Sequence, residues 1–451
     1  MRPARRIAFA IALLFATTPS VAAQSRPYRG LFGGGQPLST RGQSLDLTLS
    51  GFGGWDKPGD DTPEVAPLED TAERVNVEGP FAGSSATLVY TRPGEHLNLS
   101  GYGSGFVGYF IDNEPPWYTS SAAAFLANSR FDLTERTRLT LSEQVSWATD
   151  YRIGFMTGGT PGSDIPLASG NTGFDNSLER APSINSTANI DLTHDFTAKS
   201  SLSTYYNYRY LYFLETDNVE ARRSNLKDQI AGIRHNYRFA QYAGVHAGYA
   251  YRRTSPREGE DEDVIFHDID LGVTYNRSLS ISRRTRFSFN TGSTLAASQQ
   301  STTDDPVAGP RFYFTGGAAL THEMGRTWTA RVDYNREVTI QDGFTQPSLL
   351  DQASAGIGGL LGRRTDVTSG VYWTSGAIGL DERNYQSWLA SAQIRTGLTR
   401  SLAVYAYYYF YLYDFGAGVD LPQGLARNVD RQGVRVGFST WLPLWGARGT
   451  P

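Results

Sequence analysis

The residue types best suited to chemistry are scarce in this sequence, and their spacing argues against catalysis. The chain has no cysteine and six histidines. His267 precedes Asp268 and Asp270, which are the residue types of a proton-relay pair. Successive side chains of a strand point to opposite faces, so His267 would share a face with Ile269 and with neither carboxylate. No serine occupies a Gly-x-Ser-x-Gly motif, and the histidines are not clustered as at zinc sites. We predict no enzyme, no metal site and no cofactor.

A row of tyrosines is the clearest candidate for ligand binding. Every odd position from 405 to 413 is tyrosine, whereas the even positions from Leu402 to Leu412 are mostly aliphatic or aromatic. Such a strand has one hydroxylated aromatic face and one apolar face. Tyrosine rings stack on the C–H faces of sugars while their hydroxyls form hydrogen bonds, so the row predicts a path for saccharides. Cross-strand aromatic packing explains the same row without a ligand. Both interpretations stay open.

Charged and polar side chains recur at alternate positions of other segments, where they would face the same side as the tyrosines. The predicted inward-facing, pore-lining residues are Tyr205, Asn207, Arg209, Arg234, Arg238, Arg252, Asp268, Asp270, Arg331, Asp333, Arg395, Tyr405, Tyr407, Tyr409 and Arg435. Basic and acidic groups together would create a transverse field that selects solutes in a narrow pore. The same residues would also serve as ion pairs that brace a wide barrel, and the sequence leaves this alternative open.

The elements that must position these residues are two-faced strands. About eighteen alternating segments follow one another from Ser44 to Trp445, and short links alternate with longer polar links, as in outer-membrane barrels. Two-faced strands either stack as sheets or close into a barrel that faces lipid. A secreted sandwich or propeller is the alternative, but no blade repeat or interdomain linker is visible. We predict an all-β fold, a single transmembrane antiparallel up-and-down β-barrel of about 18 strands, with 16 as the alternative.

One carboxylate departs from this pattern. Glu143 is in register with Leu141 and Val145, at a position predicted to face lipid. A charge at that depth is costly. We therefore expect a bulge or a shifted strand at Glu143.

The ends of the chain indicate the compartment. Residues 1–23 combine Arg2, Arg5 and Arg6 with a short apolar run and the small residues Val21-Ala22-Ala23, which is typical of a cleaved signal peptide. Cleavage lowers the net charge from −4 by three to −7, which gives no indication of a nucleic-acid partner. We assign 24–43 to a periplasmic lead-in, 44–445 to the barrel and 446–451 to a C-terminal tail. No later run of about 20 apolar residues predicts a membrane helix.

The last strand carries the one motif-level likeness. Residues 433–445, from Gly433 to Trp445, resemble the closing strand of Gram-negative outer-membrane β-barrels, with a glycine, alternating apolar residues and terminal aromatics. The resemblance implies recognition by the barrel-assembly machinery. The sequence departs from it because Pro443 interrupts the expected strand and the chain continues past Trp445. In spacing and tyrosine content the chain is also similar to porin-type barrels associated with exopolysaccharide or exosortase loci.

These observations predict a pore in the outer membrane of a Gram-negative cell. We expect passive diffusion or export of small polar solutes or saccharides through it. The alternative is a non-conducting barrel that acts as an adhesin or as an assembly scaffold for surface polysaccharide. The expected partners are outer-membrane lipids and lipopolysaccharide, the assembly machinery and a saccharide, with no nucleic acid.

Overall fold

The computed structural model describes residues 43–58, 79–111, 119–151, 179–214, 225–255, 263–278, 284–298, 311–325, 327–340, 344, 347–378, 384–416, 419, 421 and 427–446. The predicted signal peptide, most of the lead-in and the predicted tail beyond Gly446 lie outside these residues. The described chain forms eighteen strands: β1 (Ser44–Pro58), β2 (Gly79–Arg92), β3 (Leu97–Phe110), β4 (Thr119–Thr134), β5 (Thr137–Tyr151), β6 (Glu179–Thr197), β7 (Ser200–Phe213), β8 (Leu226–Ala240), β9 (Ala243–Ser255), β10 (Val264–Ser278), β11 (Thr285–Ser298), β12 (Arg311–Met324), β13 (Trp328–Ile340), β14 (Pro347–Leu361), β15 (Thr365–Ile378), β16 (Tyr385–Gly397), β17 (Leu402–Phe415) and β18 (Asn428–Gly446).

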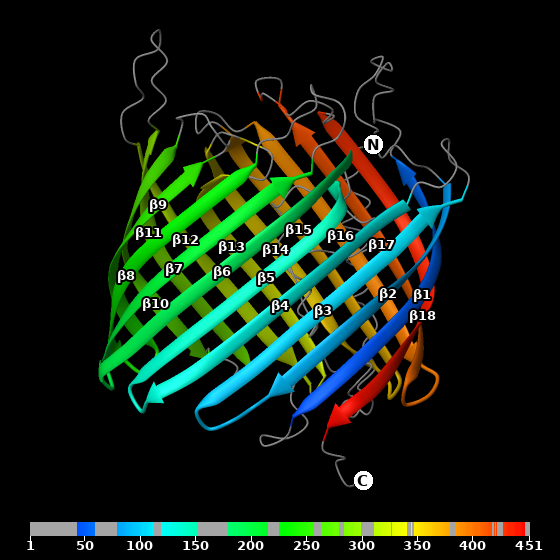
Figure 1. The fold of residues 1–451 in the computed structure, drawn as a ribbon, viewed down its shortest axis with the longest axis horizontal. Helices are drawn as coiled ribbons and strands as arrows, with labels where there is room; N and C mark the ends of the chain where they lie inside the picture. Colours follow the sequence, from blue (N-terminus) through cyan, green and yellow to red (C-terminus); the bar gives the residue numbers. More distant parts are fainter. Residues whose placement is uncertain are drawn as a thin grey trace.

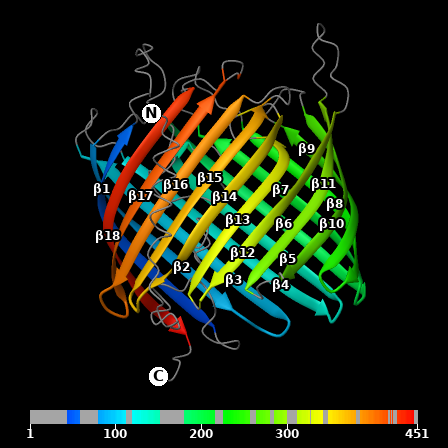
Figure 2. The same ribbon diagram turned by 180° about the vertical axis from the view of Figure 1, so that it is seen from behind.

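The eighteen strands close into one antiparallel barrel. Each strand pairs with its neighbours in sequence, and β1 pairs with both β2 and β18 (Figure 1). The predicted barrel of 18 strands is thus confirmed, and the sandwich alternative is excluded because no sheet edge remains at the closure. Figure 2 shows the wall from β12 to β18, with all strands tilted in the same sense. Among the described residues, no helix is long and apolar enough to cross a membrane.

The two ends of the barrel differ in the length of their links. At one end the strands are joined by short connections such as Glu135–Arg136 and Gln241–Tyr242. At the other end the connections are longer, as between Pro58 and Gly79. We call these the short-link end and the long-link end.

The alternation of side chains divides the wall into two faces. On β18, Val434, Val436 and Phe438 are exposed on the outer face, whereas Arg431 and Arg435 on the inner face are buried. The same alternation holds over most of the wall, and apolar side chains such as Leu271, Phe314 and Val332 are exposed on the outside. A strand has a period of two and the register is continuous over most of the wall, so side chains at alternate positions share a face.

The bulge expected at Glu143 is absent. The register of β5 runs without interruption past Glu143, which lies opposite Ala127 of β4 and Ala188 of β6. Its side chain is exposed on the outer face between Leu141 and Val145. The expectation was wrong because both cross-strand neighbours are alanines, so the glutamate displaces no side chain and the ladder needs no adjustment.

The interruption expected at Pro443 is also absent. β18 continues to Gly446, and the register with β1 shifts between Leu45, opposite Trp445, and Asp46, opposite Pro443. One extra residue, Leu444, is therefore accommodated as a β-bulge. Proline lacks the N–H that a ladder needs, and a bulge is a place where a strand tolerates it.

Candidate functional site in the barrel lumen

The fifteen predicted inward-facing residues lie on the inner face of β7, β8, β9, β10, β13, β16, β17 and β18. Their surroundings differ widely. On β7, the Tyr205 ring covers Gly232 of β8, where an added Cβ would be 2.4 Å from the ring Cζ. Asn207 and Arg209 follow on the same face, and Arg209 lies opposite Asp228 of β8 in the register. These three residues form one edge of the polar wall.

A charged cluster joins the inner faces of β8, β9 and β10. Arg252 Nη2 donates to Asp268 Oδ2 at 2.9 Å, and Arg234 forms an ion pair with Asp270. The His246 ring, on β9, places Nε2 at 2.9 Å from Asp270 Oδ1. Asp268 and Asp270, at successive inward positions of β10, therefore both form ion pairs or polar contacts with side chains of β8 and β9. This arrangement fits the bracing role at this part of the wall.

Two further ion pairs lie on other strands of the barrel, one between two neighbouring strands and one within a single strand. Arg395 Nη2 is 2.8 Å from Asp366 Oδ2, which joins β16 to β15. Arg331 Nε is 2.7 Å from Asp333 Oδ2, two residues further along β13. Asp366 was not among the predicted residues. It stands opposite Arg395 in the β15–β16 register, which the pattern of either strand alone does not determine.

Arg435 is buried in an aromatic cage instead of facing open solvent. Its guanidinium carbon lies 4.6 Å from the ring centre of Phe52, 5.9 Å from that of Phe81 and 5.5 Å from that of Tyr407. Cation–π attraction of this kind is stronger where water is excluded. Arg435 thus ties β18 to β1, β2 and β17, and only 8% of the residue is exposed.

The tyrosines of the β17 row differ in how deeply they are buried. Tyr409, Tyr411 and Tyr413 are fully buried, and the rings of Tyr409 and Tyr411 stack at a centroid distance of 6.4 Å. Tyr405 and Tyr407 are only partly buried. The part of the row that is open to a solute is therefore limited to Tyr405 and Tyr407.

A buried ion pair closes the barrel near Tyr409. Arg431 Nε donates to Asp56 Oδ1 at 2.7 Å, and Tyr409 Oη donates to Asp56 Oδ2 at 2.5 Å. These side chains come from β18, β1 and β17. Asp56 and Arg431 were missed in the sequence because each stands at the end of a strand, beside a polar link.

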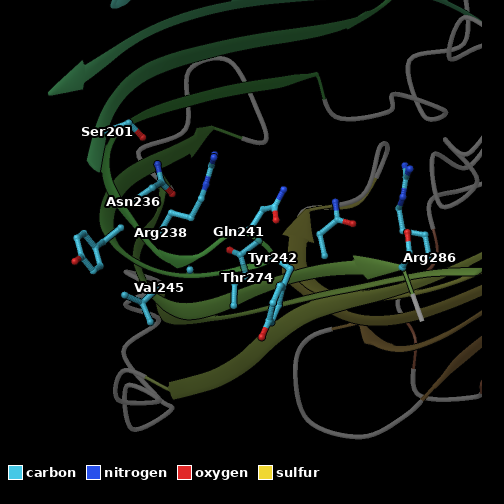
Figure 3. Close-up of a pocket in the computed structure, with 13 residues that line it drawn as sticks. Ser201, Asn236, Arg238, Gln241, Tyr242, Val245, Thr274 and Arg286 are labelled. Atoms are coloured by element: carbon cyan, nitrogen blue, oxygen red, sulfur yellow. The ribbon is translucent and has the colours of Figure 1, made fainter. Parts of the chain in front are cut away.

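The short-link end of the lumen is open and polar. A cavity of about 640 Å³ is lined by Ser201, Asn236, Arg238 and Arg286, among others, from β7, β8 and β11 (Figure 3). Among the described residues, neither Arg238 nor Arg286 forms an ion pair through its guanidinium. These two cations are therefore available to a solute.

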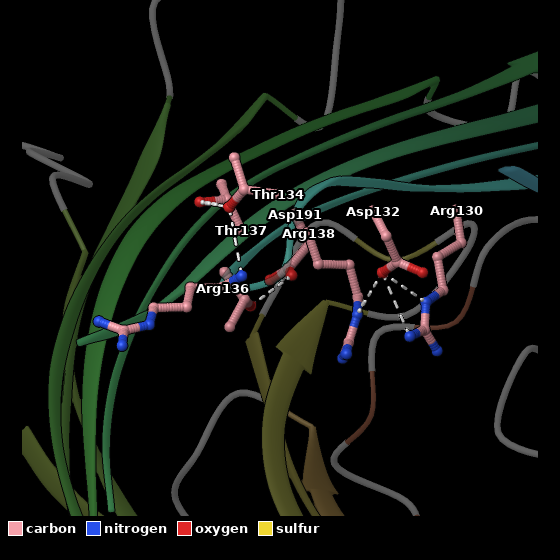
Figure 4. A network of polar contacts seen from close by, with 8 residues as sticks. Arg130, Asp132, Thr134, Arg136, Thr137, Arg138 and Asp191 are labelled. Carbon is pink, nitrogen blue, oxygen red and sulfur yellow. Dashed lines mark hydrogen bonds and ion pairs between the residues drawn. The ribbon is translucent and has the colours of Figure 1, made fainter. Parts of the chain in front are cut away.

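A second polar region lies beside this cavity at the β4–β5 turn. Arg130 Nη2 and Arg138 Nε approach Asp132 Oδ1 at 3.3 and 3.2 Å (Figure 4). An adjoining cavity of about 480 Å³ is lined by Arg136 and Lys199, among others. None of these residues was predicted, because they sit in or next to short turns where alternation gives no information.

The long-link end of the lumen is packed. Inner side chains of β7, β8, β10 and β13 to β17 form one buried apolar cluster that includes Phe266, Leu350, Tyr411 and Phe415. A second cluster of Phe52, Phe81, Phe106 and Phe110 covers the inner faces of β1 to β3. The lumen is therefore accessible and charged at one end and apolar and narrow at the other.

Comparisons with known proteins give only structural likenesses. No protein-family model and no curated protein matches the chain. Among solved structures, the chain is similar to OpdQ of Pseudomonas aeruginosa, with 11% identity and a TM-score of 0.43 over 89% of this chain and 98% of that chain. It is similar to OpdL of the same organism, with 12% identity and a TM-score of 0.41 over 89% and 99%. For OccAB4 of Acinetobacter baumannii the identity is 10% and the TM-score 0.39 over 90% and 99%. The barrel described above rests on the strand pairing of this chain alone.

Proposed function

We propose that this chain forms a pore in the outer membrane of a Gram-negative cell and passes small polar solutes. The observation that carries the proposal is the contrast between the two faces of one closed wall. Exposed apolar side chains such as Leu271, Phe314 and Val436 cover the outside, where only lipid would hide them from water. Arg234 and Arg331 on the inside are about half exposed, which supports a wet lumen.

The solutes are proposed to be anionic or hydroxylated. Arg238 and Arg286 offer guanidinium groups at the short-link end, and Ser201 and Asn236 add neutral hydrogen-bonding groups in the same cavity. Guanidinium groups bind carboxylates and phosphates through paired hydrogen bonds. Export or uptake of an acidic saccharide would use both kinds of contact, with Tyr405 and Tyr407 as the accessible aromatic surface.

Conductance of the refolded protein in a planar bilayer tests the pore. We expect stepwise ionic current and a reversal potential that favours anions under a salt gradient. Arg238→Gln combined with Arg286→Gln should reduce the anion preference, whereas Arg395→Gln combined with Asp366→Asn removes one charge of each sign and should leave it unchanged. A water-soluble monomer without detergent, or a barrel that never conducts, would contradict the proposal.

A non-conducting barrel is the second candidate. The packed apolar clusters at the long-link end favour it, because they narrow the lumen there. In that case the barrel would act as an adhesin or as a scaffold for surface polysaccharide, and no variant would open a current. The conductance measurement described above separates the two candidates.

A further inference from the structure

The barrel wall is not paired to its full height between β12 and β13. The two strands pair from Met324–Trp328 up to Gly316–Arg336 and no further. Beyond that point residues 311–315 of β12 still pair with β11, and residues 337–340 of β13 still pair with β14. The strands part at Gly316, which has a φ of 151° and where an added Cβ would be 2.5 Å from the carbonyl oxygen of Asn290. A glycine is required at this point of separation.

Beyond the separation, β13 turns into the lumen. Val332 and Tyr334 are 51% and 41% exposed on the outer face. Val338 and Ile340 continue the same alternation but are only 3% and 6% exposed. They belong to the buried cluster of the long-link end, against which Tyr313 from the inner face of β12 also packs. Outward-facing positions meet the inner faces of other strands only if this end of β13 lies inside the barrel.

Arg252 of β9 holds this end from one side. Its Nη1 donates to the carbonyl oxygen of Val338 at 2.9 Å, while its Nη2 binds Asp268. β9 and β13 are four places apart in the ring. Along a regular wall that separation is about 19 Å, which is farther than one side chain spans. The carbonyl that β12 no longer binds thus finds its donor across the lumen.

Phe344 extends the contact to the other side. It is buried, and its ring centre lies 6.1 Å from that of Phe415 on the inner face of β17. β9 and β17 are eight places apart in the ring of eighteen strands, so they stand on nearly opposite walls. The segment from residues 337–340 to residue 344 therefore crosses the lumen at the long-link end. Together with residues 347–350, which pair with residues 337–340 and on their other side with β15, it forms what we call the β13–β14 tip.

We propose that the β13–β14 tip is the gate of the pore and that Arg252 is the positioning residue that keeps it closed. The inference rests on the proposed pore function. Outward movement of the tip breaks one hydrogen bond to Arg252 and apolar contacts such as Phe344 with Phe415, but no backbone ladder to β12. Residues 348–350 are paired with residues 376–378 of β15, so the end of β15 moves with the tip. Arg252 stays paired with Asp268 when it releases Val338. The unpaired edges of β12 and β13 then meet and extend their ladder, which offsets the lost contacts.

The gate is tested first with Arg252→Ala in planar bilayers. The variant should conduct about tenfold more often than the unmodified protein, as expected when one hydrogen bond to a charged group no longer holds the closed state. Arg395→Ala is the matched control. Arg395 forms a similar pair with an aspartate of the neighbouring strand, Asp366 of β15, and is 14% exposed, against 17% for Arg252. Equal effects of both substitutions would overturn the gate.

A reversible lock gives a second measurement. Because the chain has no cysteine, Phe344→Cys combined with Phe415→Cys introduces the only thiol pair. Oxidation should abolish the conducting steps and dithiothreitol should restore them, whereas either single variant should respond to neither treatment. Current that is the same in the oxidised and the reduced double variant overturns the gate alone. Absence of current in every variant, reduced and oxidised, overturns the pore itself.

Discussion

At the scale of single residues, the Asp56 carboxylate is the most constrained group described. It receives hydrogen bonds from Arg431 and Tyr409, and all three residues are almost inaccessible. A buried ion pair adds little stability compared with an apolar replacement of both partners. Removal of one partner alone is costly because the other charge stays buried. The network therefore specifies how the barrel closes more than it strengthens the fold.

Asp56→Ala should lower the free energy of unfolding by about 3–5 kcal/mol, because Arg431 remains buried without its counter-ion. Tyr409→Phe should lower it by roughly 1.5–3 kcal/mol through loss of one hydrogen bond to a charged acceptor. Urea unfolding in detergent, followed by tryptophan fluorescence, measures both changes. Tyr408→Phe is the control, since Tyr408 lies on the outer face of the same strand and is 40% exposed. A similar loss for Tyr408→Phe would refute the role given to Asp56.

Gly433→Val should destabilise the barrel by about 1–3 kcal/mol through overpacking. An added Cβ at Gly433 would lie 2.4 Å from Cζ of Tyr409, whose ring covers this glycine. Gly103→Ala is the control, because no atom lies within 4 Å of the added Cβ there. The unfolding midpoint in urea compares the two. If Gly433→Val is tolerated as well as Gly103→Ala, the ring packing described for Tyr409 is wrong.

The sequence indicates the face of a residue but not its depth. Alternation places Arg252 and Arg395 on the inner face because the period of a strand is a local property. Arg435 lies on the same face, yet it is enclosed by aromatic rings, and two of them, Phe52 and Phe81, come from strands hundreds of residues away in the chain. The partner of Arg395, Asp366, follows from the register of two strands, which local pattern does not determine.

At the scale of elements, the outer face of β5 carries an exposed carboxylate. Glu143→Leu should raise the free energy of unfolding in a lipid or detergent environment by about 1–2 kcal/mol, since acids on the lipid face cost less than Arg or Lys but still destabilise. Glu135→Leu, in the β4–β5 turn, is the control and should not stabilise. Heat-dependent gel mobility reports the midpoint. A drop in stability for Glu143→Leu would indicate that Glu143 has a partner.

The strands themselves were predictable, whereas the break between β12 and β13 was not. Short and longer links alternate along the sequence, and counting these links predicts the eighteen strands correctly. The separation at Gly316 depends on pairing with both neighbours, and Gly316 is one of 48 glycines. The positions of Val338 and Ile340 follow the outward pattern, so sequence alone assigns them to the wrong surface.

At the scale of the whole molecule, the lumen is accessible at one end and packed at the other. Asn236→Cys, in the cavity of the short-link end, should react rapidly with a water-soluble maleimide. Ser387→Cys, on the inner face of β16 near its long-link end and 0% exposed, should react far more slowly. Mass spectrometry of the labelled barrel measures both rates in an otherwise cysteine-free chain. Equal rates would mean that the long-link half is as open as the short-link half.

The closure of the barrel has a consequence for its biogenesis. Asp56 and Arg431 are 375 residues apart in the chain, so Asp56 does not have the counter-ion of the finished barrel until the last strand arrives. In a partly assembled sheet, the Asp56 carboxylate on the free edge of β1 must therefore be hydrated or shielded by another protein. A product truncated before β18 is disfavoured in the bilayer twice, by its unpaired edge and by an unneutralised charge. Asp56, Tyr409 and Arg431 thus favour the complete barrel over truncated products.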